Sequence, residues 1–122
     1  MLKFKLESKE KISIKAFMEM RLIDMMVDQR HFAVFVDDRI FIDDICLLAR
    51  EFVAYTLEWQ KKPDGDFIYN TIDDEENPLI AFNRLENGWK LQSVWQEFEC
   101  PKIFSTDEVK SFINGIISQI IF

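Results

Sequence analysis

The sequence predicts an α+β fold in which an antiparallel sheet of about five or six strands packs against two main helices. Short runs rich in β-branched and aromatic residues, separated by turn signals, indicate the strands. Two longer segments with apolar residues every three or four positions indicate the helices. The chain contains no linker, internal repeat or low-complexity run, so we expect residues 1–122 to form a single domain.

The first part of the chain predicts a strand and a hairpin. Residues 2–6 alternate apolar and lysine side chains, which is typical of a strand with one face in water. Residues 31–36 and 39–42 are rich in β-forming residues, and the Asp37-Asp38 pair between them suits a two-residue turn. Residues 12–29 fit both a strand and a helical stripe, and good helix formers favour a helix for the later part of this segment.

Two amphipathic segments predict the main helices. An apolar stripe at residues 44–62 begins beside Asp43 and Asp44, whose carboxylates are suited to cap a helix N-terminus. A second stripe, at residues 106–121, follows a Ser-x-x-Glu capping box. We expect Phe112, in the middle of this second stripe, to be deeply buried.

Three further strands are predicted between the two helices, at residues 66–72, 78–84 and 89–98. The connections are an acidic loop at residues 73–77 and a turn at residues 85–88 that contains an Asn-Gly pair. Connections this short join neighbouring antiparallel strands, so these strands are expected to form a meander.

Large apolar side chains are numerous, with twelve Phe, five Met and three Trp. We interpret most of them as core, including the cluster of Met18, Met20, Met25 and Met26, because thioethers commonly fill irregular gaps between other side chains. Trp95 lies in a predicted strand whose two faces both carry apolar groups. Either helices cover both faces of this strand, or a partner covers one.

The charge is acidic and unevenly distributed. The net charge is −7; residues 1–30 carry seven Lys/Arg against five Asp/Glu, and residues 31–122 carry eight against seventeen, so +2 and −9 sum to −7. This excess disfavours nucleic acid as a partner and favours a basic protein. The acidic turns are predicted to stand in solvent without internal partners, and with Trp95 they form the candidate partner-binding set: Asp37, Asp38, Asp73, Asp74, Glu75 and Glu76.

The residue types argue against several classes of chemistry. The single His31 cannot form a two-histidine metal pair, the three glycines make no phosphate-binding loop, and Cys46 and Cys100 form no CxxC pair. The run 73–76 lacks the spacing and central glycine of a calcium-binding loop. The sequence therefore predicts no catalytic residues, no metal site and no cofactor. No segment reads as a signal peptide or a membrane span, which predicts a cytoplasmic protein without membrane contact.

About half of the chain lies in segments that carry a resemblance: Trp59, Phe67-Ile68-Tyr69, the segment from Asp73 to Leu79, and the segment from Gly88 to Gln96. Through these segments the chain resembles a family of small uncharacterised proteins from Bacillus and relatives. The resemblance implies a bacterial cytosolic origin and carries no known activity. In size, acidity and lack of catalytic residues the chain is also similar in type to immunity proteins that neutralise bacterial polymorphic toxins.

Three functions stay open on the sequence alone. The leading hypothesis is a non-enzymatic protein–protein interaction module, in the form of an immunity protein whose acidic face blocks a basic toxin domain. The first alternative is a small ligand-binding or enzymatic domain with a pocket between sheet and helices. The second is a structural homo-oligomer that buries the spare apolar surface.

Overall fold

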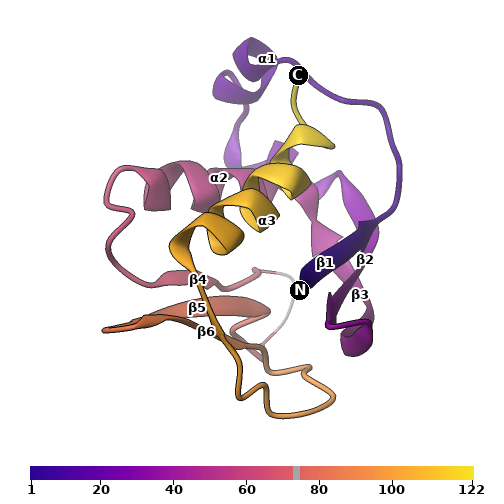
Figure 1. Ribbon diagram of the computed structural model, residues 1–122. Coiled ribbons are helices and arrows are strands. Elements are labelled where there is room, and N and C mark those ends of the chain that lie inside the picture. Colours follow the sequence, from indigo (N-terminus) through magenta and orange to yellow (C-terminus); the bar gives the residue numbers. More distant parts are fainter. Residues whose placement is uncertain (73–74) are drawn as a thin grey trace.

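The computed structural model describes residues 1–72 and 75–122, and in these ranges the chain forms two antiparallel sheets and two main helices (Figure 1). The predicted α+β class is confirmed, as are its antiparallel strands. The strands do not form one sheet, however: three belong to a first sheet and four to a second within the described ranges.

The first sheet has the order β1-β2-β3, with β1 at Leu2–Leu6, β2 at Gln29–Val36 and β3 at Arg39–Leu48. Its central hairpin is the predicted one. Asp37 and Asp38 have positive φ angles of 50° and 67°, the left-handed pair that a tight two-residue hairpin turn requires. Aspartate tolerates this conformation better than most residues, which explains its presence at both positions.

The first main helix begins later than predicted. Residues 43–48 continue β3, and helix α2 spans Ala49–Gln60. The aspartates at 43 and 44 therefore do not cap it; its N-cap is Leu48, which makes no side-chain capping bond. Pairing of β3 with β2 extends as far as the Gln29–Leu48 pair and buries Leu47 and Leu48. This non-local pairing and burial outweigh the local capping preference of the aspartates.

Residues 12–29 contain two short helical segments before β2 begins. Ser13 caps helix α1 (Ile14–Met18) by accepting from the Ala16 amide, and a 3₁₀ turn, η1, spans Leu22–Met26. The helical interpretation of this segment was thus the better one. The core assignment of the methionines is only half correct: Met20 and Met25 pack against the core, whereas Met18 and Met26 are 69% and 40% exposed.

The second sheet has the order β4-β5-β6-β7, from Phe67–Tyr69, Ile80–Leu85, Gly88–Gln92 and Ile103–Phe104. The predicted three-stranded meander is confirmed as β4, β5 and β6, and β7 adds a fourth strand that was not predicted. The third strand ends at Gln92 rather than 98, because the chain turns away at Ser93. Gly88 has a φ of 148°, and a Cβ there would approach the Phe104 carbonyl oxygen to 2.6 Å, so the turn needs glycine.

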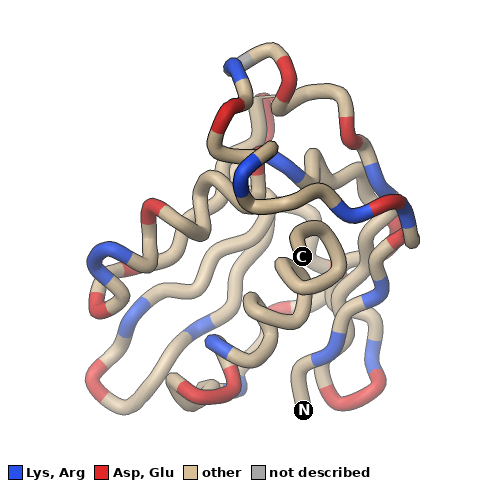
Figure 2. The backbone as a smooth tube through the Cα atoms, turned by 90° about the horizontal axis from the view of Figure 1, so that it is seen from above, with Lys and Arg blue, Asp and Glu red and all other residues tan. Residues whose placement is uncertain are grey.

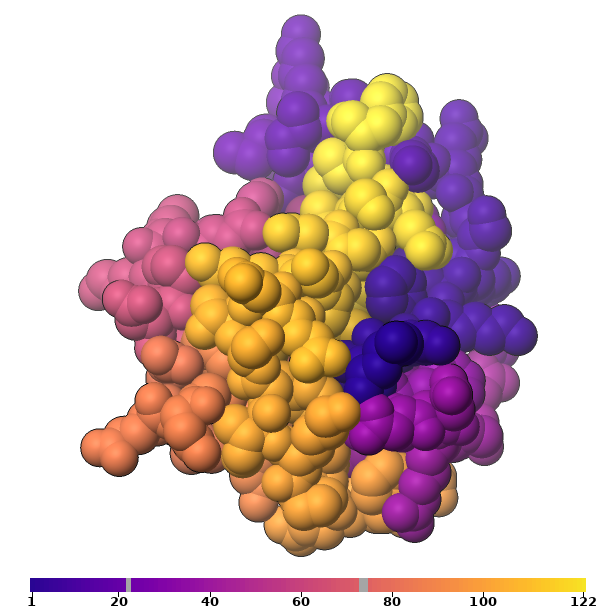
Figure 3. Space-filling view, in the orientation of Figure 1, coloured from indigo at the N-terminus to yellow at the C-terminus, as the bar shows by residue number. Residues whose placement is uncertain are grey.

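Helix α3 (Thr106–Ser118) lies between the two sheets, where Figure 3 shows it in yellow-orange beside the indigo β1 segment. The predicted cap is present, since the Ser105 hydroxyl accepts from the Glu108 amide. Phe112 is 4% exposed, and its ring meets those of Phe4 in β1 and Phe82 in β5, each at 5.7 Å between centroids. One continuous core therefore joins both sheets through α3.

Candidate functional site

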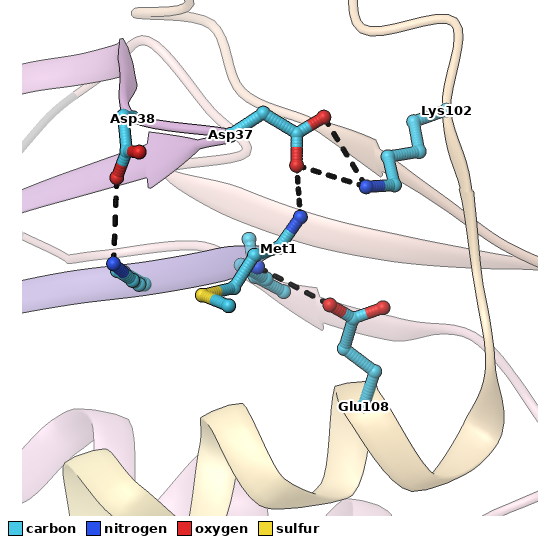
Figure 4. Close-up of polar contacts among 7 residues, drawn as sticks. Met1, Asp37, Asp38, Lys102 and Glu108 are labelled. Carbon is cyan, nitrogen blue, oxygen red and sulfur yellow. Dashed lines mark hydrogen bonds and ion pairs between the residues drawn. The ribbon is translucent and has the colours of Figure 1, made fainter.

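The acidic hairpin turn, predicted to be without internal partners, is held by cations of the chain itself (Figure 4). The Asp37 carboxylate accepts from the Met1 ammonium and from Lys102 Nζ, the latter at 2.9 and 3.2 Å. Asp38 pairs with Lys3 at 3.3 Å. Both aspartates are exposed, as predicted, but their charges are offset locally. Ion pairs therefore link the hairpin turn to the start of the chain and to the segment before β7.

We predict that Asp37→Asn alters the pH dependence of stability while keeping the turn, since asparagine also tolerates positive φ. Hydrogen bonds from the Met1 ammonium and Lys102 lower the pKa of Asp37 below its ordinary value of 3.8. A carboxyl with a lowered folded-state pKa stabilises the fold above its ordinary pKa, and this contribution is lost as the pH falls through the lowered value. Melting temperatures of wild type and variant should differ most near neutral pH and converge below pH 3.8. Parallel curves over that range would contradict the assignment.

The other acidic positions do not gather into one acidic face. Figure 2 shows acidic and basic residues interleaved along the backbone, with the lysines of β1 beside the acidic hairpin turn. Of the predicted acidic loop, Asp73 and Asp74 lie outside the described residues, whereas Glu75 and Glu76 are exposed. The net negative charge of the chain is therefore not concentrated on one face, and it does not by itself locate a partner-binding surface.

Trp95, the one aromatic residue in the predicted set, stands on a turn that hydrogen bonds hold in place. The buried Ser93 hydroxyl donates to the Leu79 carbonyl at 2.6 Å and accepts from the Trp95 amide at 3.0 Å. The Gln96 side-chain oxygen accepts from the Ser93 amide at 3.1 Å. The indole above this turn is 40% exposed. The backbone that carries Trp95 is thus held in place, so binding through this indole would order little additional backbone.

The same turn connects the second sheet to the first. The backbone of residues 96–97 pairs with residues 41–42 of β3, through a bridge and an amide-to-carbonyl bond of 2.8 Å. Trp95 therefore lies beside the next residues of β3, Asp43 and Asp44. Both carboxylates are exposed, and they lie at the register shift between the Val34–Ile42 and Phe32–Ile45 pairs.

These residues line a hollow of about 360 Å³, which we name the Trp95 hollow. Its lining combines two carboxylates with apolar side chains and one indole: Asp43, Asp44, Ile45, Cys46, Thr71, Leu79 and Trp95. Asp43 makes no ion pair with any residue of the described ranges, while Asp44 lies 2.9 Å from His31 Nδ1. The hollow thus carries negative charge beside the Trp95 indole.

Asp43 and Asp44 also line a second hollow, of about 610 Å³, on the outer face of the first sheet. We name it the outer-sheet hollow; its wall also includes Ala33 and Phe35, and it carries one lysine, Lys5, and a third carboxylate, Glu7. The two aspartates therefore lie between two concave surfaces, and a partner that contacts one can extend into the other. Together the hollows form the candidate functional site.

The two carboxylates and the indole are groups that can contact a cationic side chain. An arginine side chain can pair its guanidinium with a carboxylate and stack it on an indole, which matches the acidic and aromatic walls. Among the residues that the structure describes, no three His, Cys, Asp or Glu side chains converge as metal ligands would.

Sequence reasoning placed Trp95 in the site but missed the two aspartates that accompany it. Asp43 and Asp44 were assigned to a helix cap, a role that two adjacent acidic residues before an apolar stripe often play. The signal that could have identified them is the β-branched Ile45, which continues the strand pattern of residues 39–42.

The fold is that of a small α+β protein whose surface carries two exposed carboxylates beside an exposed indole. By sequence, the chain belongs to the family described as Domain of unknown function (DUF7878), whose model matches residues 2–120. The predicted membership of an uncharacterised family is confirmed at that level. No curated protein and no solved structure matches the chain significantly.

No helix in the described part of the chain combines the length and apolar composition needed to cross a membrane.

Proposed function

We propose that this protein is a protein–protein interaction module that binds a basic partner through the Trp95 hollow. The observation that carries the proposal is the 40% exposed indole, on a hydrogen-bonded turn, beside the carboxylates of Asp43 and Asp44. Exposed tryptophans anchor many interfaces, because burying an indole removes a large apolar surface from water. The adjacent carboxylates select a cationic partner and speed its approach.

Within this class, we infer an immunity protein that blocks a basic toxin domain in the bacterial cytoplasm. Two features support this form: the net charge of −7 and a binding surface built on a compact fold that one core holds together. An inhibitor of a toxin has to associate quickly and selectively, and complementary charge supplies both properties. Nucleic acid and membranes are not expected partners, because an excess of negative charge repels phosphate.

The test begins with the neighbouring genes and with capture of partners from the source cell. A toxin-like reading frame beside this gene would supply a purified partner domain for binding kinetics. With that partner, Trp95→Ala should weaken binding about tenfold or more, mainly through faster dissociation. The double variant Asp43→Asn/Asp44→Asn should instead slow association and flatten its dependence on salt.

Matched controls lie elsewhere on the surface. Phe122→Ala truncates an aromatic side chain that is 74% exposed, and Asp107→Asn neutralises an exposed carboxylate at the start of α3. Neither change should alter the kinetics. If the Trp95 and Asp43/Asp44 variants also bind with wild-type rates at low and moderate salt, this surface is not the interface.

A further inference from the structure

A separate pocket of about 450 Å³ lies between α2, η1 and the segment that follows β4. We name it the Glu51 pocket after its one ionisable carboxylate. Its walls are mostly apolar and include one aromatic ring: Met25, Met26, Ala54, Tyr55 and Ile72, with Glu51, Asn70 and Thr71 supplying the polar groups. This size lies within the range of sites for small organic ligands, about 300–1,000 Å³.

The Glu51 carboxylate is fixed in one orientation by two donors. Its Oε1 accepts from the Tyr69 hydroxyl at 2.7 Å, and its Oε2 accepts from the Ile72 amide at 3.1 Å. Burial, together with donation of the hydroxyl hydrogen to Glu51, raises the pKa of Tyr69, so the hydroxyl stays a donor. The carboxylate is thus a preorganised acceptor at the edge of the pocket.

No cation of the described ranges forms an ion pair with Glu51, which is only 9% exposed. The neighbouring Arg50 turns toward Asp28 instead, with its Nε 3.9 Å from Oδ2. Buried carboxylates are usually paired, because an isolated negative charge loses its hydration without compensation. A ligand with one positive charge could therefore pair with the Glu51 carboxylate, which no cation of the described ranges does.

The surrounding apolar side chains restrict the kind of cation. Met26, Tyr55 and Ile72 are 40%, 37% and 60% exposed, so much of the apolar wall is open to an incoming group. A hydrated metal ion would find few oxygen ligands here, whereas an ammonium on an aromatic or aliphatic body can satisfy the carboxylate and cover these side chains. The Tyr55 ring also offers a face to such a cation.

We propose that the Glu51 pocket binds a small organic ammonium ion with an apolar body, the ammonium at the Glu51 carboxylate and the body between Met26, Tyr55 and Ile72. The pocket adjoins the Trp95 hollow, with which it shares Thr71, but its proposed ligand does not depend on the proposed partner. Its function would be to make the protein responsive to a small cationic metabolite or signal.

The probe is 2-phenylethylamine, which is protonated at neutral pH, and its neutral counterpart is 2-phenylethanol. Titration of the full chain, followed by amide and methionine-methyl NMR signals, should show saturable shifts at the Ile72 amide and the Met26 methyl. The alcohol should bind at least about tenfold more weakly, because it cannot form the charge-assisted bond. Equal binding of the two compounds, or no shift at these two groups, would overturn the proposal.

Two variants distinguish the contribution of the Glu51 charge to binding from that of the pocket volume. Glu51→Gln removes the charge and should weaken amine binding at least about tenfold, while Ala54→Leu fills the pocket and should abolish binding of both compounds with Glu51 intact. The control Glu58→Gln, on the exposed side of the same helix, should bind as wild type does. Retained binding in Ala54→Leu would place the amine elsewhere. Binding of a lysine-containing apolar peptide without binding of the amine would assign the pocket to a protein and overturn the small-ligand proposal.

Discussion

Replacing Arg30 with methionine is expected to lower the free energy of unfolding by about 3–5 kcal/mol, because it leaves a buried carboxylate without its principal partner. Arg30 is 1% exposed and Asp28 8% exposed. The guanidinium binds both Asp28 oxygens at 2.9 Å and donates to the Gln119 carbonyl at 3.1 Å. After the substitution the nearest cation is Arg50, whose Nε lies 3.9 Å from Asp28. Urea unfolding of the two proteins measures the difference.

Two further variants test whether the loss of stability in Arg30→Met comes from the unpaired Asp28 charge. Arg30→Lys keeps the charge but cannot form the two-pronged bond to Asp28 together with the bond to Gln119, so it should also be destabilised. In the double variant Asp28→Leu/Arg30→Met both charges are absent, and much of the lost stability should return. Arg21→Met, an exposed control, should change stability by no more than about 0.5 kcal/mol. A loss below about 1 kcal/mol in Arg30→Met would mean that solvent reaches the pair.

The parts of the fold that follow from nearby residues were predictable. The Asp37-Asp38 turn, the Ser105 cap and the stripe of α3 each depend on interactions within a few positions, and each occurs where the sequence places it. The start of α2 did not follow from such signals. Its position depends on the pairing of β3 with β2, whose partners are up to 19 residues apart, as in the Gln29–Leu48 pair.

The division of the strands into two sheets could not be predicted for a similar reason. Each hairpin is visible in the sequence, but whether hairpins share a sheet depends on which edges pair across the chain. Here α3 separates β1 from β5, with Phe112 in contact with a ring on each side. The pairing of residues 96–97 with β3 is also non-local, and it is what brings Trp95 to the aspartates.

The candidate sites, too, depend on contacts between residues that are far apart in the sequence. Trp95 was singled out because both faces of its predicted strand carry apolar groups, which left open a face for a partner; in the structure its side chain is 40% exposed. The two aspartates beside it were missed because they were assigned to a helix cap, and Glu51 was not singled out at all. Glu51 points to Tyr69 and Ile72, about 20 positions away, and only the folded chain brings these groups together.

Truncating Phe112 to alanine is expected to cost about 3–5 kcal/mol, since it opens a cavity where α3 meets both sheets. The ring is 4% exposed and meets Phe4 edge-on at 85° and Phe82 at 72°. Loss of this ring removes one of the contacts that join the two sheets. Phe122→Ala, the same truncation at a side chain that is 74% exposed, should change stability by no more than about 0.5 kcal/mol.

The measurement is urea unfolding followed by tryptophan fluorescence, which reports on α2 and the second sheet through Trp59 and Trp89, and by far-ultraviolet circular dichroism, which reports on the whole chain. In the wild type the two probes should give one transition, because a single core joins the sheets. In Phe112→Ala the midpoint should fall, and the two transitions should separate if this ring is the main link between the sheets. A loss below about 1 kcal/mol would place Phe112 outside the core.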